Sequence, residues 1–469
     1  MRKRGVLRDR LWSRLTLWSS IVLIGMLWAP ALQEYRSLWS DVAELKQLEI
    51  AGIVERPLKF TPKGATTHMM VYAYRRQDDA WRNGRERMKV FLRDTSLQVS
   101  IGDTLYLRGN AKRLETDNDS YRAYLQKQGM HFILFAYDLK QGGQGQSWEL
   151  KIRRMQGRLS ELWEEFCEKQ EYASLAQAMF LGKKDNMSAD LRERFATAGF
   201  SHLLAISGLH VGILFVLLSL VVRPLQAHLS GRILATVLQL SALAGFCLLS
   251  GAAASVIRAS SMFAVYLIVK LCYKRAHPLN IWAFCGLLQL LWEPGDMMNI
   301  GFQLSYLAVG VLIVFLPLYV EWVKTPWPWL NRIYDLVGVN ILATAATAPL
   351  IWHYFGTFPT YFLPANLLVA PVIFVLVLVG FLTVILSMFS PSLAAYPAWL
   401  CEKGLMWLDL VATEVQTWPF AKLEGSPSPT SHHSNLLGEL VFAFLLIILP
   451  KILRLFHRRM ITQNGRQGI

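Results

Sequence analysis

The sequence predicts a polytopic α-helical membrane protein with a small extracytoplasmic β domain near its N-terminus, and three observations support this. Hydrophobic residues make up 53% of the 469 residues and charged residues only 17%, which is less charge than soluble domains carry. Several apolar runs reach the ~20 residues that cross a bilayer. Residues 33–150, in contrast, are polar and contain short runs with the alternating pattern of β-strands.

The first element is residues 1–32, where the basic sequence MRKRGVLRDR precedes the apolar sequence LTLWSSIVLIGMLWAPAL. WAPALQE is a poor match to the small-residue cleavage site of a signal peptide. We therefore expect an uncleaved first span whose basic start lies in the cytoplasm. The domain that follows it, residues 33–150, then lies outside the cytoplasm.

Residues 33–150 contain four alternating pieces, HMMVYAY, RMKVFLRD, DTLYLRGNAKRL and MHFILFAYD. Short strands separated by Gly, Asp and Asn predict a small β-barrel or sandwich. One basic segment, YRRQDDAWRNGRERMKVFLR, combines cations with aromatic rings, which is what single-stranded nucleic acids need. Short basic runs are also common in solvated loops, and both readings stay open. Its candidate contact residues are Arg75, Arg76, Trp81, Arg82, Arg85 and Arg87.

For the remaining chain, we expect amphipathic linker helices over 151–200, on or near the membrane surface. A polytopic membrane domain follows over 201–455, and a basic cytoplasmic tail over 456–469. The apolar segments fall at 202–222, 233–250, 256–272, 279–292, 302–320, 333–352, 363–390 and 436–453. The basic loops RPLQAHLSGR and KLCYKRAHP read as cytoplasmic, and the acidic loop EPGDMM as external.

The span count is expected to be 8–10. If both termini are cytoplasmic, the number of spans is even, so one segment is re-entrant or 393–415 crosses. That last stretch contains Glu402, Lys403, Asp409 and Glu414, and an amphipathic helix in the interface fits it better. The first half of 202–222 and the short segment 279–292 are the candidates for a re-entrant piece.

Polar side chains within these apolar segments are the candidate functional residues, because they are costly in lipid unless they face protein or water. In FSHLLAISGLHVG, Ser207 and His210 would share one helix face. In LLSGAAASVIRASSM, Arg258 is the only strong charge. We favour an anion-facing arginine over one bonded to carbonyls, because guanidinium matches phosphate geometry. Gln303 and Ser305 in NIGFQLSYLAVGVL are explained equally well by helix–helix hydrogen bonds and by a pore.

Four motifs in order, GFSHLLAISGLHVG, SVIRASSM, WEPGDMMNIGFQLSYLAVGVL and PANLLVAP, resemble the membrane domain of the ComEC/Rec2 competence family. IGDTLYLRGNAKRL followed by NDSYRAYLQKQGM resembles the family's OB-like domain. The resemblance covers about residues 51–450 and implies passage of single-stranded DNA across the inner (plasma) membrane during natural transformation. We hypothesise that the matched residues line or gate this path. They are His202, Leu204, Ser207, Gly208, His210, Arg258, Gln303, Ser305 and Asn366.

Many family members continue into a metallo-β-lactamase-like nuclease domain with an HxHxDH metal set. This sequence contains no such set, no CxxC and no Walker A pattern. We therefore expect no metal, no cofactor and no enzymatic activity of its own. The expected partners are single-stranded DNA, an extracytoplasmic DNA receptor, a separate nuclease, and a cytoplasmic ATP-driven motor or single-strand-binding protein. Self-association into a homo-oligomer stays open.

Two other functions compete with a DNA channel. The same fold could transport another polymer or solute. An intramembrane serine hydrolase could use Ser207 and His210. Residues three apart on one helix seldom align Oγ with an imidazole nitrogen, and Ala205 replaces the first glycine of a GxSG pattern. We therefore expect the hydrolase least.

Overall fold

The computed structural model describes residues 44–425, except for 56–57, 62–63, 77–79, 94–98, 100–101, 114–129, 145–147, 185, 273–276, 294–295 and 298. The chain forms two compact units, one over residues 34–158 and one from residue 159 onward. The predicted first span, the segment 436–453 and the basic tail lie outside the described residues.

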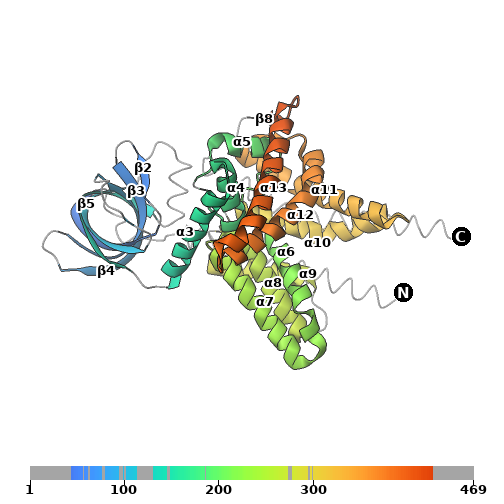
Figure 1. The fold of residues 1–469 in the computed structure, drawn as a ribbon, viewed down its shortest axis with the longest axis horizontal. Helices are drawn as coiled ribbons and strands as arrows, with labels where there is room; N and C mark the ends of the chain where they lie inside the picture. Colours follow the sequence, from blue (N-terminus) through green and yellow to red (C-terminus); the bar gives the residue numbers. More distant parts are fainter. Residues whose placement is uncertain are drawn as a thin grey trace. The chain divides into compact units, whose positions relative to one another are not determined.

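The first unit is a closed five-stranded barrel (Figure 1). Strand β1 pairs with both β3 and β5, which closes the order β1-β3-β4-β6-β5; β4 and β6 are parallel and the other pairs antiparallel. The strands are β1 (Glu44–Val54), β3 (Gly64–Arg76), β4 (Arg82–Leu92), β5 (Asp103–Arg113) and β6 (Met130–Gln144), with the short β2 (Lys59–Thr61) paired to β3. The predicted small β domain is confirmed, and the closed five-stranded order supports an OB-like interpretation.

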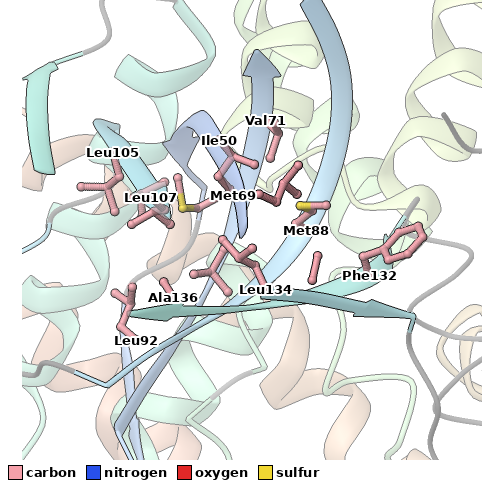
Figure 2. Packing of buried hydrophobic residues seen from close by; sticks show 14 residues of the cluster. Ile50, Met69, Val71, Met88, Leu92, Leu105, Leu107, Phe132, Leu134 and Ala136 are labelled. Carbon is pink, nitrogen blue, oxygen red and sulfur yellow. The ribbon is translucent and has the colours of Figure 1, made fainter. Parts of the chain in front are cut away.

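Alternating residues of these strands fill the barrel, as the period of two requires. On β5, for example, Leu105 and Leu107 are buried whereas Tyr106 and Arg108 are exposed. Figure 2 shows Ile50, Met69, Met88, Leu107 and Leu134 meeting inside the barrel. The outward residues are thereby free to form a binding surface.

The second unit is helical (Figure 1). The long helix α3 (Trp148–Phe166) leads into it. The elements after α3 are α4 (Gln170–Leu181), α5 (Ala189–Thr197), α6 (Gly208–Val221), η2 (Arg223–Ala227), α7 (Leu229–Leu249), α8 (Ala254–Cys272), α9 (Pro278–Trp292), α10 (Ile300–Val323), α11 (Pro328–Phe355), α12 (Phe362–Ser387) and α13 (Pro391–Thr417), with β7 (Thr357–Pro359) paired to β8 (Lys422–Glu424).

Five of the described helices, α7, α8, α10, α11 and α12, are long and apolar enough to cross a membrane, whereas α6 and α9 are apolar but shorter. This confirms a multi-pass membrane protein. α6 begins at Gly208 rather than at His202. The first six residues of the predicted segment 202–222 are therefore not helical.

Two helices pack differently from the prediction. α4 is buried from Tyr172 to Leu181, so it is a core helix rather than an amphipathic one on the membrane surface. In α13, Glu402 and Asp409 are buried, whereas Tyr396, Trp399 and Leu410 are exposed. The acidic residues that suggested a water-facing side of this helix thus point into the protein. They do so because Glu402 accepts the Glu168 N–H at 2.6 Å, and Asp409 lies 3.6 Å from Arg194 Nη2.

Candidate functional site

The residues just before α6 form a helix cap. Ser207 Oγ accepts a hydrogen bond from Leu209 N at 3.2 Å, and Ser207 N donates to His210 Nδ1 at 3.2 Å. His210 thus takes the place that Glu or Gln occupies in a capping box. The prediction that Ser207 and His210 share one helix face is wrong as stated, because Ser207 precedes the helix as its N-cap, and His202 lies further upstream.

The second ring nitrogen of His210 is buried without a partner. Because Nδ1 accepts from a backbone N–H, the neutral ring carries its proton on Nε2. The His210 side chain is fully buried, and Nε2 has no hydrogen-bond partner within the described part of the chain. Buried donors are nearly always paired, so this nitrogen can take a water molecule or a polar ligand. His202 is exposed, with Nδ1 3.1 Å from Gly199 O.

The cap is attached to α8 through small residues. Ser255 Oγ, at the start of α8, donates to Ile206 O at 2.6 Å. A Cβ atom on Gly208 would lie 3.7 Å from the Cβ of Ala259, so the helices approach closely there, as small residues allow. The cap residues and Arg258 are therefore carried by two helices in direct contact.

Arg258 connects α8 to α10 while part of its guanidinium stays unpaired. Only 4% of the residue is exposed. Its Nη2 donates to Gly301 O at 3.0 Å and to Ser305 Oγ at 2.9 Å. Nε and Nη1 are buried without a partner among the described residues, as is the Oγ of Ser260 on the same helix. Arg258 thus bonds a carbonyl, as a structural arginine would, and retains two donors that could face an anion.

Gln303 joins α10 to α11 and has both ends of its amide satisfied. Nε2 donates to Met297 O at 2.9 Å, and Tyr354 Oη donates to Oε1 at 3.2 Å. The sequence did not single out Tyr354 as a partner. Its signal was the aromatic pair His353–Tyr354 directly before the helix end at Gly356.

The same region contains a second polar contact that the sequence analysis missed. Gln289 Nε2 on α9 donates to Asp296 Oδ2 at 2.6 Å, in the linker before α10. Asn299 then caps α10 by accepting from Gly301 N at 2.9 Å. These contacts hold the linker, whose Met297 carbonyl accepts from Gln303, and the start of α10, whose Gly301 carbonyl accepts from Arg258.

The structure thus brings the predicted site residues together in pairs. Ser207 contacts His210, Arg258 contacts Ser305, and Gln303 bonds outside the predicted set. Leu204 and Asn366 are buried, and no hydrogen bond between described residues joins Asn366 to the others. Polar contacts therefore run from α6 to α8, α10 and α11, rather than around one shared ring of side chains.

On the outer surface of the barrel, Trp81 contacts aromatic and cationic side chains that form a patch. The guanidinium of Arg75 lies over the Trp81 ring, 5.1 Å from its centroid. Trp81 also meets Tyr106 edge to face at 6.5 Å, although Tyr106 lies on β5. Tyr72 is hydrogen-bonded to Tyr106. Burial, and to a smaller extent this hydrogen bond, raises the pKa of the Tyr72 phenol. We call Tyr72, Arg75, Trp81 and Tyr106 the barrel patch.

The predicted arginines are not equivalent. Arg75 pairs with Glu49, and Arg87 pairs with Glu55 at 3.1 Å. Arg76 and Arg82 are exposed at the end of β3 and the start of β4. The side chain of Arg85 lies outside what the structure describes. Arg76 and Arg82 therefore remain the exposed arginines suited to an external ligand, whereas Arg75 is paired with Glu49 as Arg87 is with Glu55.

Comparison with known proteins identifies several relatives. The chain is 27% identical over 251 residues to ComE operon protein 3 of Bacillus subtilis, covering 54% of this chain and 31% of that protein. It is 32% identical over 237 residues to an uncharacterized protein of Aquifex aeolicus, covering 50% of this chain and 53% of that protein. The matches therefore span between about a third and about half the length of these relatives. No solved structure matches the chain.

The profile of the Competence protein family matches residues 179–452, more than half of the chain. This range contains α6 and α8 to α11, which carry the contacts of Ser207, His210, Arg258 and Gln303. The chain therefore belongs to the Competence protein family.

Proposed function

We propose that this protein forms the path by which single-stranded DNA crosses the inner membrane during natural transformation. Membership of the Competence protein family supports a role in DNA uptake, and the apolar helices support a multi-pass location in the membrane. The single-stranded substrate, the inner membrane and the path itself are our inference.

The observation that carries this proposal is the buried, partly unpaired guanidinium of Arg258. Phosphates cannot enter lipid without replacing their hydration, and guanidinium donors match phosphate oxygens. Nε and Nη1 of Arg258 lack partners, and so does His210 Nε2 on the neighbouring helix. We infer that these donors face DNA or its water when the helices separate, and that the Arg258–Ser305 contact closes the path at rest.

The barrel patch supports a first contact with DNA. Its rings are partly exposed, with 43% of Trp81 and 46% of Tyr106 accessible. Aromatic rings beside cations hold single strands by stacking and charge. We infer that the barrel holds the strand on the external side of the membrane before transfer.

Transfer requires other proteins in this proposal. The sequence contains no Walker A pattern, so we assign the driving force to a cytoplasmic motor or a single-strand-binding protein. An extracytoplasmic receptor would deliver the duplex, and a separate nuclease would remove the other strand.

The test is transformation after deletion of the gene and complementation with variants. Arg258→Gln should lower DNA entry while the protein stays abundant in the membrane. Arg332→Gln removes the same charge from an exposed position on α11 and should leave DNA entry unchanged. Unchanged transformation in the deletion strain, with single-stranded and duplex DNA, would contradict the proposal and favour transport of another solute.

A second candidate, a serine hydrolase, is favoured by one distance. Ser207 Oγ lies 3.0 Å from His210 Nδ1, because Ser207 is a cap residue rather than a helical one. However, Nδ1 already accepts the Ser207 N–H, and no described carboxylate bonds Nε2, although a third group normally orients the base. Fluorophosphonate labelling of Ser207 would establish the hydrolase, and the absence of labelling would remove it.

A further inference from the structure

A cationic pocket lies away from the site described above, where α6, η2, α7 and α8 meet. Its volume is about 420 Å³. Arg223, Arg232 and Lys270 line it, and no Asp or Glu is among its described lining residues. Arg232 Nη2 reaches Lys270 O at 3.4 Å, and Lys270 Nζ lies over the Tyr266 ring at 5.6 Å. Three cations without an acidic neighbour indicate an anionic ligand.

The other side of the pocket is apolar and continues along the membrane-facing helices. Val216 and Leu220 line it and are 53% and 59% exposed. Leu267 and Leu271 line it from α8, a helix able to cross a membrane. A ligand that fits this pocket therefore combines an anionic group with a hydrocarbon chain.

A hydrogen bond joins α6 to α7 between two lining residues of the pocket. Gln239 is the lining residue furthest from the start of α7, and its Nε2 donates to Ser219 Oγ on α6 at 2.8 Å. Gln239 is only 2% exposed. A strand of nucleic acid passing through would have to break this contact, whereas a ligand entering from the lipid side would not.

We propose that this pocket binds the phosphate headgroup of an anionic phospholipid, with an acyl chain along Val216 and Leu220. The sequence segments 223–232 and 270–278, which contain the three cations, are the basic segments whose charge predicts a cytoplasmic position. Anionic lipids are concentrated in that leaflet, and basic pockets between membrane helices bind their headgroups. The bound lipid would connect α6, which carries His210, to α7 and α8.

The experiment uses the purified full-length chain in detergent, with phosphatidylglycerol and phosphatidylcholine as the probes. Native mass spectrometry counts the bound lipids, and titration gives Kd. The triple variant Arg223→Gln, Arg232→Gln and Lys270→Gln should weaken phosphatidylglycerol binding about a hundredfold, and Arg223→Gln alone about fivefold. Binding of phosphatidylcholine should not change.

The matched control replaces two arginines and one lysine that are exposed elsewhere, Arg158, Arg332 and Lys324. It should bind phosphatidylglycerol like the unmodified chain. Val216→Trp keeps the cations and obstructs the apolar side, so it should also weaken phosphatidylglycerol binding; a site for free phosphate would not respond.

Three results would overturn the proposal. One is an equal loss of phosphatidylglycerol binding by the pocket triple variant and the control triple variant. Another is unchanged phosphatidylglycerol binding by Val216→Trp. The third is a pocket triple that loses a labelled oligonucleotide but keeps phosphatidylglycerol, which would make the pocket a nucleic-acid site. Arg223→Gln decides the matter if the triple variant does not fold, because Arg223 is exposed.

Discussion

At the scale of single residues, the hydrogen bonds of buried polar atoms distinguish the candidate functional residues better than their residue types do. Arg258 and Gln303 both interrupt apolar helices, yet Gln303 has its amide satisfied at both ends whereas Arg258 keeps two unpaired donors. An unpaired buried donor is costly, so its presence indicates a ligand or water that the protein meets in function. This difference separates Arg258 from Gln303 as a candidate for contact with DNA.

Two substitutions of Ser207 distinguish a role in capping α6 from a role as a nucleophile. Ser207→Ala should lower the free energy of unfolding by ~1 kcal/mol through loss of the N-cap. Ser207→Asn should retain stability and DNA uptake, because asparagine caps helices well but supplies no hydroxyl nucleophile. Thermal unfolding in detergent and transformation frequency measure the two effects. Normal stability with abolished function in Ser207→Asn would instead indicate catalysis.

The start of α6 is a feature that the hydropathy of the sequence does not reveal. The apolar run 202–222 has the composition of one continuous span, and hydropathy does not locate the residue at which a helix begins. The usual signal is Ser followed three residues later by Glu or Gln. Here His210 takes that place, so the start of α6 was not recognised.

At the scale of elements, local sequence patterns predict features that depend on neighbours along the chain, but not contacts between distant segments. The alternation of β5 and the apolar lengths of α7, α8, α10, α11 and α12 were visible in the sequence. The contact of Trp81 with Tyr106 was not, because it depends on β1 lying between β3 and β5. The burial of Glu402 in α13 likewise depends on a backbone N–H at residue 168.

The barrel patch should bind single-stranded DNA through Trp81. Trp81→Ala in the full-length chain should raise Kd roughly fivefold to a hundredfold, the range that a lost base stack gives. Tyr137 is 57% exposed on β6 and lies outside the patch, so Tyr137→Ala is the control. Fluorescence anisotropy with a labelled oligonucleotide measures both. Equal effects of the two substitutions would remove the patch from DNA binding.

The end of α4 should depend on a glycine. Gly182 has φ 71°, and a Cβ there would lie 2.8 Å from Ser250 O. Gly182→Ala should cost at least ~1–2 kcal/mol of unfolding free energy, the cost of a left-handed backbone with a side chain. Gly245 lies within α7 with no atom within 4 Å of such a Cβ, so Gly245→Ala should be neutral or stabilising. Similar thermal midpoints for both variants would contradict the packing of α4 on the turn before α8.

At the scale of the whole molecule, the protein combines a small β-barrel with a helical membrane domain whose helices are joined by hydrogen bonds. Loop charge alone suggests the direction of the chain across the membrane. Contacts from α6 through α8 and α10 to α11 mean that movement of one helix changes the surroundings of the next. We therefore expect the path to open by separation of α8 from α10, with the barrel supplying the strand.

The water accessibility of residue 260 during DNA uptake tests a DNA path along α8 most directly. The five native cysteines, at positions 167, 247, 272, 285 and 401, are first replaced. Ser260→Cys puts a thiol at the buried unpaired hydroxyl on α8, and Leu238→Cys puts one on the exposed apolar face of α7. A path along α8 that is closed at rest predicts that transforming DNA raises the rate at which a cationic, membrane-impermeant thiol reagent labels the cysteine at position 260, to several-fold above the rate at position 238. Labelling at 260 that is no faster than at 238, with and without DNA, would contradict a path along α8.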